Sequence, residues 1–282
     1  MPPSFEPLIV LSQGIELHVR QRHPSGTPAV LFLHGWLDNS HTFDWVLEHL
    51  PDTWRIVLID FRGMGRSAHV PFGGNYTFAD YLLDVESTLD TLGLSEAHLV
   101  GHSLGGNVAT AYAAARPARI KSVTLIESLG PTGGSPDGAL DRLRGFLDDA
   151  QRPPRRKSYP SVEEAAARLR ENNSSLTEAA SLHLARYGTE PAEGGYVFRF
   201  DPLHRRRFGH GFDEAQWLAI LSAITSPVQL LSGSNGLTAD DARVRARLAA
   251  MRPAKTLTLS GGHHVHMEQP EAVARALEHF IR

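Results

Sequence analysis

Continuous apolar runs recur along this chain and alternate with segments of helical spacing. Runs without apolar–polar alternation are typical of parallel strands covered by helices on both faces. They occupy residues 29–33, 55–60, 97–100, 120–127 and 227–232. Because strands and helices alternate between residues 29 and 127, the pattern predicts an α/β fold with a mostly parallel, doubly wound sheet.

Shorter predicted elements extend this sheet domain: a hairpin of residues 8–11 and 15–21, a strand at 255–259, and helices at 77–92, 239–251 and 270–281. The helix at 77–92 carries its apolar residues on one side and its acidic residues on the other. Thr77, with Asp80 three residues later, predicts the cap that begins this helix.

The pattern changes at residues 130–136, a cluster of glycine, proline and serine that interrupts regular structure. Charged, helical segments follow at residues 139–150, 162–171 and 176–187, and an isolated strand is predicted at 194–201. The basic run at 152–157 is interpreted as a solvated loop. We therefore expect a mostly helical lid, residues 130–213, inserted into a core domain of residues 1–129 and 214–282.

Composition narrows the classes of function. The chain has 282 residues and a formal net charge of −3, which gives no electrostatic reason to expect nucleic acid or a membrane surface as a partner. It has no cysteine, which excludes disulfides, thiolate zinc sites and a cysteine nucleophile. No secretory signal and no apolar run of membrane-spanning length is recognised, so we expect a cytoplasmic protein with a small-molecule partner. The sequence does not decide between a monomer and a homodimer.

The sequence Gly-His-Ser-Leu-Gly at residues 101–105 joins a predicted strand directly to a small-residue helix. A Gly-x-Ser-x-Gly pattern between strand and helix is the nucleophile elbow, in which a strained serine is lifted clear of the sheet. The helix N-terminus favours developing negative charge beside it. Ser103 is therefore the predicted nucleophile.

A serine hydroxyl needs a base within hydrogen-bond reach. His263 is the best candidate, because its Gly-Gly-His loop directly follows the last predicted strand. His264 and His266 are competitors for this role. The three histidines together also suggest a metal site, but no carboxylate–histidine ligand motif accompanies them, and the reading we favour requires no metal and no cofactor.

The oxyanion of a tetrahedral intermediate needs preorganised N–H donors. One is expected from Leu104, the residue after the nucleophile, and the other from Trp36 in the loop after the strand at 29–33. Gly35 allows that loop to fold back over the site.

The acid that orients the histidine is expected after the strand at 227–232, but residues 232–237 contain no carboxylate. Asp240 and Asp241 come later and suit the cap of the next helix. Glu127 ends the strand that follows the Ser103 helix, and it can reach the histidine because neighbouring strand ends converge. We favour Glu127 and keep the two aspartates as alternatives.

Four stretches resemble the α/β-hydrolase fold superfamily: residues 34–39 (HGWLDN), 60–67 (DFRGMGRS), 101–106 (GHSLGG) and 262–270 (GHHVHMEQP). The first, with residues 172–176 (NNSSL) and 264–267 (HVHM), is similar to the serine-hydrolase-like proteins of that superfamily. The resemblance implies Ser103 as nucleophile, His263 as base, and Trp36 and Leu104 as oxyanion donors.

The chain departs from the usual pattern by carrying Gly236 near the place of the usual aspartate. Haloalkane dehalogenases in the same superfamily carry their acid after the earlier strand, which is the position of Glu127. Their nucleophile is an aspartate, so Ser103 does not imply their reaction. The expected activity is hydrolysis of a small carboxylic ester or similar acyl bond through an acyl-enzyme on Ser103. Hydrolysis of a carbon–carbon bond, or ligand binding without catalysis, are the alternatives.

Overall fold

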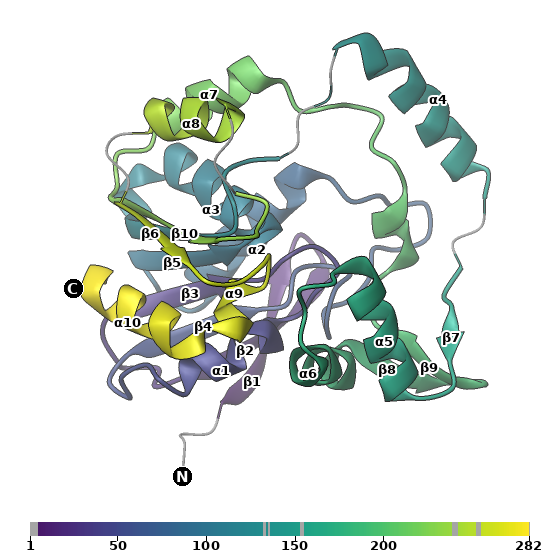
Figure 1. The fold of residues 1–282 in the computed structure, drawn as a ribbon, viewed down its shortest axis with the longest axis horizontal. Coiled ribbons are helices and arrows are strands. Elements are labelled where there is room, and N and C mark those ends of the chain that lie inside the picture. The colour runs from purple at the N-terminus through teal and green to yellow at the C-terminus, as the bar shows by residue number, and fades with distance from the viewer. Residues whose placement is uncertain are drawn as a thin grey trace.

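An eight-stranded sheet lies at the centre of the computed structural model, which describes residues 5–131, 134, 136–152, 155–238, 242–251 and 255–281 (Figure 1). Its strand order is β1-β2-β4-β3-β5-β6-β10-β11. The strands are β1 (Glu6–Ser12), β2 (Ile15–Arg22), β3 (Ala29–Leu33), β4 (Arg55–Ile59), β5 (Ala97–His102), β6 (Ile120–Ile126), β10 (Val228–Gly233) and β11 (Lys255–Leu259). The β1–β2 and β2–β4 pairs are antiparallel and every other pair is parallel, which confirms the mostly parallel sheet.

Helices cover both faces of this sheet, as the continuous apolar strands require. The helices are α1 (Asp44–Leu47), α2 (Phe78–Thr91), α3 (Leu104–Ala115), α7 (Glu214–Ser222), α8 (Ala242–Ala250), α9 (Val265–Glu268) and α10 (Pro270–Phe280). Strand β3 shows the division: Leu31 and Leu33 join the apolar cluster under α2, α3, α7 and α8, whereas Val30 and Phe32 join the cluster under α1 and α10. Figure 1 shows α7 and α8 on one side of the sheet and α10 on the other.

Helix α2 begins where its cap predicts. The Asp80 carboxylate accepts hydrogen bonds from the backbone N–H of Thr77 at 2.7 Å and from its hydroxyl at 2.9 Å. This contact satisfies a donor at the helix N-terminus that has no partner within the helix. Helix α7 was not predicted, although its Trp217 is one of the largest fully buried side chains.

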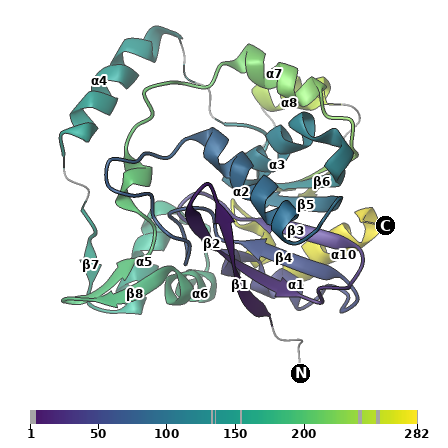
Figure 2. The ribbon, with the colours of Figure 1, turned by 180° about the vertical axis from the view of Figure 1, so that it is seen from behind.

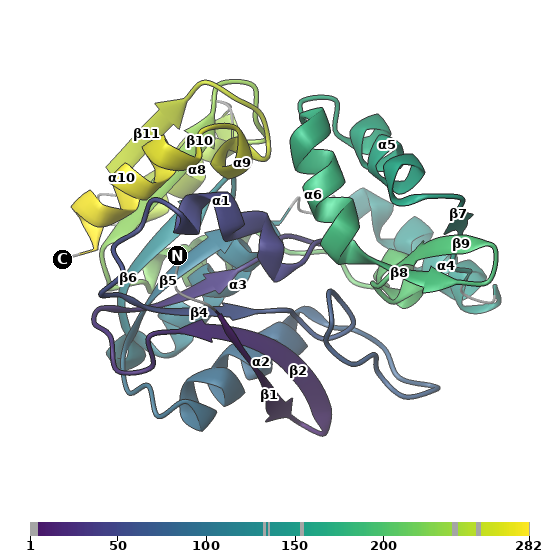
Figure 3. The same ribbon diagram turned by 90° about the horizontal axis from the view of Figure 1, so that it is seen from below.

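The chain between β6 and α7 forms a separate layer with helices α4 (Ala139–Ala150), α5 (Val162–Asn172) and α6 (Glu178–Gly188). It also forms strands β7 (Ser158–Tyr159), β8 (Thr189–Ala192) and β9 (Gly195–Phe198). Short 3-10 helices occur in both parts of the molecule, in the core at Ser40–Phe43 and Pro117–Arg119 and in this layer at Pro136–Gly138 and Pro202–Arg205. Figures 2 and 3 show this layer beside the core, and Figure 2 shows α4 at its outer margin.

The strand predicted at 194–201 is present as β9, but it is not isolated. Strand β9 is the centre of a three-stranded antiparallel sheet, order β7-β9-β8. Its partners are too short for a periodic pattern to identify. The boundaries of the lid, residues 130–213, stay a prediction. No helix among the described residues has both the length and the apolar composition needed to span a bilayer.

Candidate active site

Ser103 lies in a sharp turn between β5 and α3, with φ 51° and ψ −114°. A residue other than glycine is strained at positive φ, which is the backbone state expected of a nucleophile elbow. The flanking glycines allow the close approach of neighbouring backbone. A Cβ on Gly101 would lie 2.4 Å from the carbonyl oxygen of Gly105, and one on Gly105 would lie 2.0 Å from that of Leu33.

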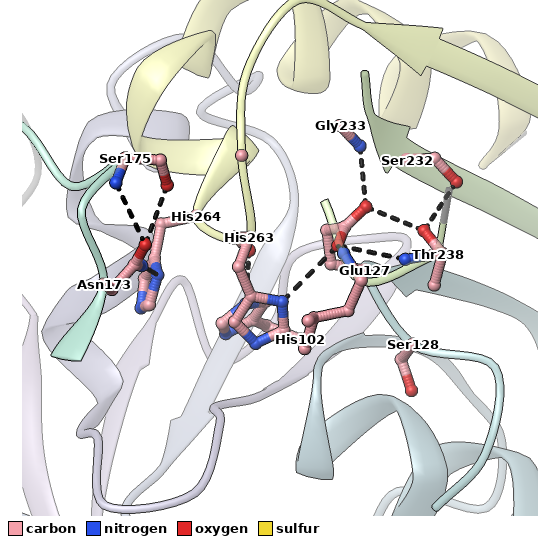
Figure 4. A network of polar contacts seen from close by, with 12 residues as sticks. His102, Glu127, Ser128, Asn173, Ser175, Ser232, Gly233, Thr238, His263 and His264 are labelled. Carbon is pink, nitrogen blue, oxygen red and sulfur yellow. Dashed lines mark hydrogen bonds and ion pairs between the residues drawn. The ribbon is translucent and has the colours of Figure 1, made fainter. Parts of the chain in front are cut away.

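His263 lies in the loop between β11 and α9, beside the end of β5. The Nε2–H of His102, the residue before Ser103, donates to the His263 carbonyl at 2.8 Å. The Nδ1 of His263 is 3.4 Å from Oε2 of Glu127. The structure therefore brings together the end of the nucleophile strand, the predicted base and the favoured acid (Figure 4).

The two competing histidines have other partners. Nδ1 of His264 accepts from the side-chain amide of Asn173 at 2.8 Å. Nε2 of His266, which is fully buried, lies 2.8 Å from the hydroxyl of Thr42. Only His263 of the three contacts Glu127 among the interactions of the described residues, so geometry favours it as the base.

Glu127 directly follows β6, has φ 50° and is 2% exposed. Its carboxylate accepts from the backbone N–H of Gly233 at 2.7 Å and from the hydroxyl of Thr238 at 2.7 Å, and Leu237 N–H also donates to it. Burial raises the pKa of this carboxyl, but the hydrogen bonds from His263, Thr238 and the backbone outweigh burial and hold the pKa below its usual value. Glu127 is thus fixed as a carboxylate.

The carboxylate of Glu127 occupies the space beside Gly236. A Cβ built on Gly236 would lie 2.2 Å from Cδ, Oε1 and Oε2 of Glu127. The carboxylate of Glu127, which follows β6, therefore occupies the position that the side chain of residue 236, in the loop after β10, would otherwise enter. The alternatives Asp240 and Asp241 lie outside the described residues.

Both predicted oxyanion donors lie near Ser103. Leu104 is the first residue of α3, where a backbone N–H has no partner within the helix. A Cβ on Gly35 would lie 3.5 Å from Cβ of Ser103, so the loop that carries Trp36 passes close to the nucleophile. Trp36 itself is 49% exposed, so its side chain is not packed into the core.

Buried His34 holds this loop in place, a role that sequence reasoning did not assign. Its Nδ1–H donates to the carbonyl of Gly35 at 2.7 Å, and its Nε2 accepts from the backbone N–H of Phe61 at 3.0 Å. Burial lowers the pKa of His34, so the ring stays neutral and can both donate and accept. Thr238 is a second residue that was missed, since no motif marks a hydroxyl that donates to a distant acid.

Two groups of side chains offer metal-ligand atoms within 4.8 Å of one another: Asp38, His102 and His264, and His41, Asp44 and His183. In the second group Arg20 already lies 2.8 Å from one oxygen of Asp44, and His41 lies 2.7 Å from the other. Of the predicted cluster of three histidines, only His264 belongs to a group found within the described residues.

Comparison with known proteins places this geometry in context. A family model described as alpha/beta hydrolase fold matches residues 28–270. A serine hydrolase-like protein of Danio rerio is 32% identical over 271 residues, which cover 92% of this chain and 83% of that protein. Among solved structures, a hypothetical protein of Pseudomonas aeruginosa PAO1 has a TM-score of 0.90 and 32% identity over 98% of this chain and 99% of that one. A thioesterase domain from the curacin biosynthetic pathway has a TM-score of 0.87 and 29% identity over 98% and 99% of the two chains.

Proposed function

This chain belongs to the alpha/beta hydrolase fold family, and from that premise we propose that it is a serine hydrolase cleaving a carboxylic ester or similar acyl bond. The observation that carries the proposal is the contact between His263 and Glu127 beside the strained Ser103. These three side chains come from three separate loops at one edge of the sheet. A nucleophile, a base and an orienting carboxylate in one place are the components of acyl transfer.

In the proposed mechanism Glu127 accepts the Nδ1–H of His263, which leaves the Nε2 lone pair as the base. His263 takes the proton of Ser103 as the hydroxyl attacks the acyl carbon. The N–H groups of Leu104 and Trp36 stabilise the oxyanion of the tetrahedral intermediate. His263 then protonates the leaving group, which departs. Water takes its place: His263 removes a proton from the water as its oxygen attacks the acyl-enzyme, and it returns this proton to the oxygen of Ser103 as the acid product leaves.

The place of the acid also bears on the non-catalytic alternative. That alternative was motivated by the missing carboxylate after β10. Because the Glu127 carboxylate fills the space beside Gly236, the absence of a carboxylate after β10 no longer argues against catalysis, and we favour the catalytic reading. The resemblance to a thioesterase domain supports including thioesters with oxygen esters in a substrate panel, beside a carbon–carbon bond substrate.

Labelling by a fluorophosphonate probe tests the proposal. The wild-type chain should label in equal molar ratio, and Ser103→Ala should abolish labelling. Ser222→Ala is the matched control, because Ser222 is an exposed serine on α7 whose hydroxyl donates to its own helix at Leu218. A folded wild-type protein that does not label, or labelling that survives Ser103→Ala, would contradict a Ser103 acyl-enzyme.

A further inference from the structure

Three side chains next to the proposed catalytic residues form a group of their own. Asp38 lies in the loop after β3, His102 precedes Ser103, and His264 follows His263. One carboxylate oxygen and one nitrogen from each ring lie within 4.8 Å of one another. The group therefore joins the three loops that carry the oxyanion donor, the nucleophile and the base.

Two atoms of this group have unused hydrogen-bonding capacity. Oδ2 of Asp38 and Nδ1 of His102 are buried and have no hydrogen-bond partner in the described part of the chain. Buried polar atoms are nearly always paired, so two orphaned acceptors in one place point to a bound group that attracts lone pairs. A cation meets this requirement.

The orientation of His102 suits a metal ligand. Its Nε2–H donates to the His263 carbonyl at 2.8 Å, so the lone pair of the neutral ring is on Nδ1. A ligating histidine whose other nitrogen donates to a backbone carbonyl is the usual arrangement around protein-bound metals.

His264 offers the third ligand. Asn173 occupies its Nδ1, which leaves Nε2 for the site. For Nε2 to bind a metal, Nδ1 must carry the hydrogen and donate to the amide oxygen of Asn173. A half-turn of that amide provides the oxygen. It gives up the hydrogen bonds that this oxygen now accepts from the hydroxyl of Ser175 at 2.8 Å and from its backbone N–H at 3.3 Å, a cost that metal coordination must outweigh.

The chemistry of the three ligand atoms indicates which cation would bind. Two imidazole nitrogens and one carboxylate oxygen suit Zn²⁺ and similar transition metals, whereas Ca²⁺ and Mg²⁺ prefer oxygen ligands. The group of His41, Asp44 and His183 differs, because Arg20 already neutralises its carboxylate.

We propose that Asp38, His102 and His264 bind one divalent transition-metal ion, such as Zn²⁺, which joins the oxyanion, nucleophile and histidine loops. The bound ion has a structural role in this proposal. It takes no part in the acyl-transfer steps, so the proposal stands or falls independently of the proposed hydrolase activity.

Titration of the chelator-treated full chain with ZnCl₂ by calorimetry, and with CoCl₂ by visible absorption, tests the site. We expect one equivalent to bind to the wild type and the affinity to fall by about 100-fold or more in Asp38→Asn and in His264→Gln, since each variant removes a ligand. Asp44→Asn is the matched control, because it removes a half-buried carboxylate from the group of His41, Asp44 and His183, which lies outside the proposed site. It should bind as the wild type does.

Because a misfolded variant would also lose the metal, a second test uses a variant that is expected to gain a signal. His264→Cys should retain cobalt and add a thiolate-to-cobalt absorption band, which can come from residue 264 alone because the natural chain has no cysteine. Circular dichroism verifies the fold of each variant. The proposal is overturned if the wild type takes up no metal, if Asp38→Asn and His264→Gln bind as the wild type does, or if Asp44→Asn loses the ion. Buried water would then be the occupant.

Discussion

At the scale of single residues, the candidate site depends on two non-glycine residues held at positive φ, Ser103 and Glu127. Each directly follows or ends a parallel strand, and neighbouring strand ends bring the two side chains to one edge of the sheet. Backbone strain at both positions is held by the pairing of β5 with β6 and of β6 with β10. Strain at two adjacent strand ends is one observation on which the proposed active site rests.

Replacement of Glu127 by glutamine should cause a large fall in kcat. The amide cannot stabilise the imidazolium of His263, and the loss in comparable triads reaches about 10⁴-fold at the upper end. Steady-state hydrolysis of an activated ester measures the effect. Glu96→Gln removes an exposed carboxylate that pairs with Lys121 and is the control. Unchanged activity in Glu127→Gln would transfer the role to Asp240 or Asp241.

The space beside Gly236 permits a rescue experiment. In Glu127→Ala the carboxylate leaves the region that a Cβ on residue 236 would enter. The double variant Glu127→Ala/Gly236→Asp should recover at least about 10-fold of the lost kcat/KM, because a carboxylate again faces His263. Glu127→Ala/Gly236→Asn has the same shape without the charge and should stay at the level of Glu127→Ala. Equal rates in the two double variants would refute the interchange of positions.

At the scale of elements, the sheet could be predicted because buried parallel strands are continuous apolar runs. Helix α7 could not, because Trp217, Leu218, Ile220 and Leu221 spread apolar residues around the helix and leave no clear polar face to mark a period. The short strands β7 and β8 likewise carry too few residues for a period.

In the site, the Gly-x-Ser-x-Gly turn and the Gly-Gly-His loop were visible as local motifs. The donors to Glu127 were not, because Gly233 and Thr238 are set by tertiary packing around an acid 106 and 111 residues away.

Helix α2 offers a stability test separate from the site. Thr77→Ala removes the hydroxyl that pairs with Asp80, and the free energy of unfolding should fall by about 0.5–1 kcal/mol, since Thr77 is exposed. Urea denaturation measures the change. Thr77→Ser keeps a capping hydroxyl and should lie close to the wild type. A fall in hydrolysis of an activated ester by folded Thr77→Ala would contradict a purely stabilising role of this cap.

At the scale of the whole molecule, buried and half-buried histidines give the protein a common response to acid. Burial lowers the pKa of seven of them: His34, His41, His98, His102, His204, His264 and His266. For His98 and His204 the pKa falls to about 4 from an unfolded value of 6.5. Below pH 6.5 the unfolded chain therefore binds more protons than the native protein does.

Stability should accordingly be complete above pH 6.5 and decline steadily as the pH falls towards 4. Each such histidine contributes a slope of up to about 1.4 kcal/mol per pH unit in this window. Urea midpoints measured between pH 7.5 and pH 4 would establish the slope. His98→Asn should make it shallower, whereas His210→Asn, at an exposed position, should not. Midpoints that stay level down to pH 4 would contradict the expectation.

Because Glu127 lies at the end of β6, the proposed catalytic residues are distributed unevenly along the chain. Four of them precede residue 130: Trp36, Ser103, Leu104 and Glu127. Only His263 follows, more than a hundred residues later. During synthesis on the ribosome, the nucleophile is therefore complete with its acid and both donors well before its base has been translated. With these proposed roles, the nascent chain should not react with a fluorophosphonate until β11 and the histidine loop dock against the sheet, so the onset of reactivity would report that docking step.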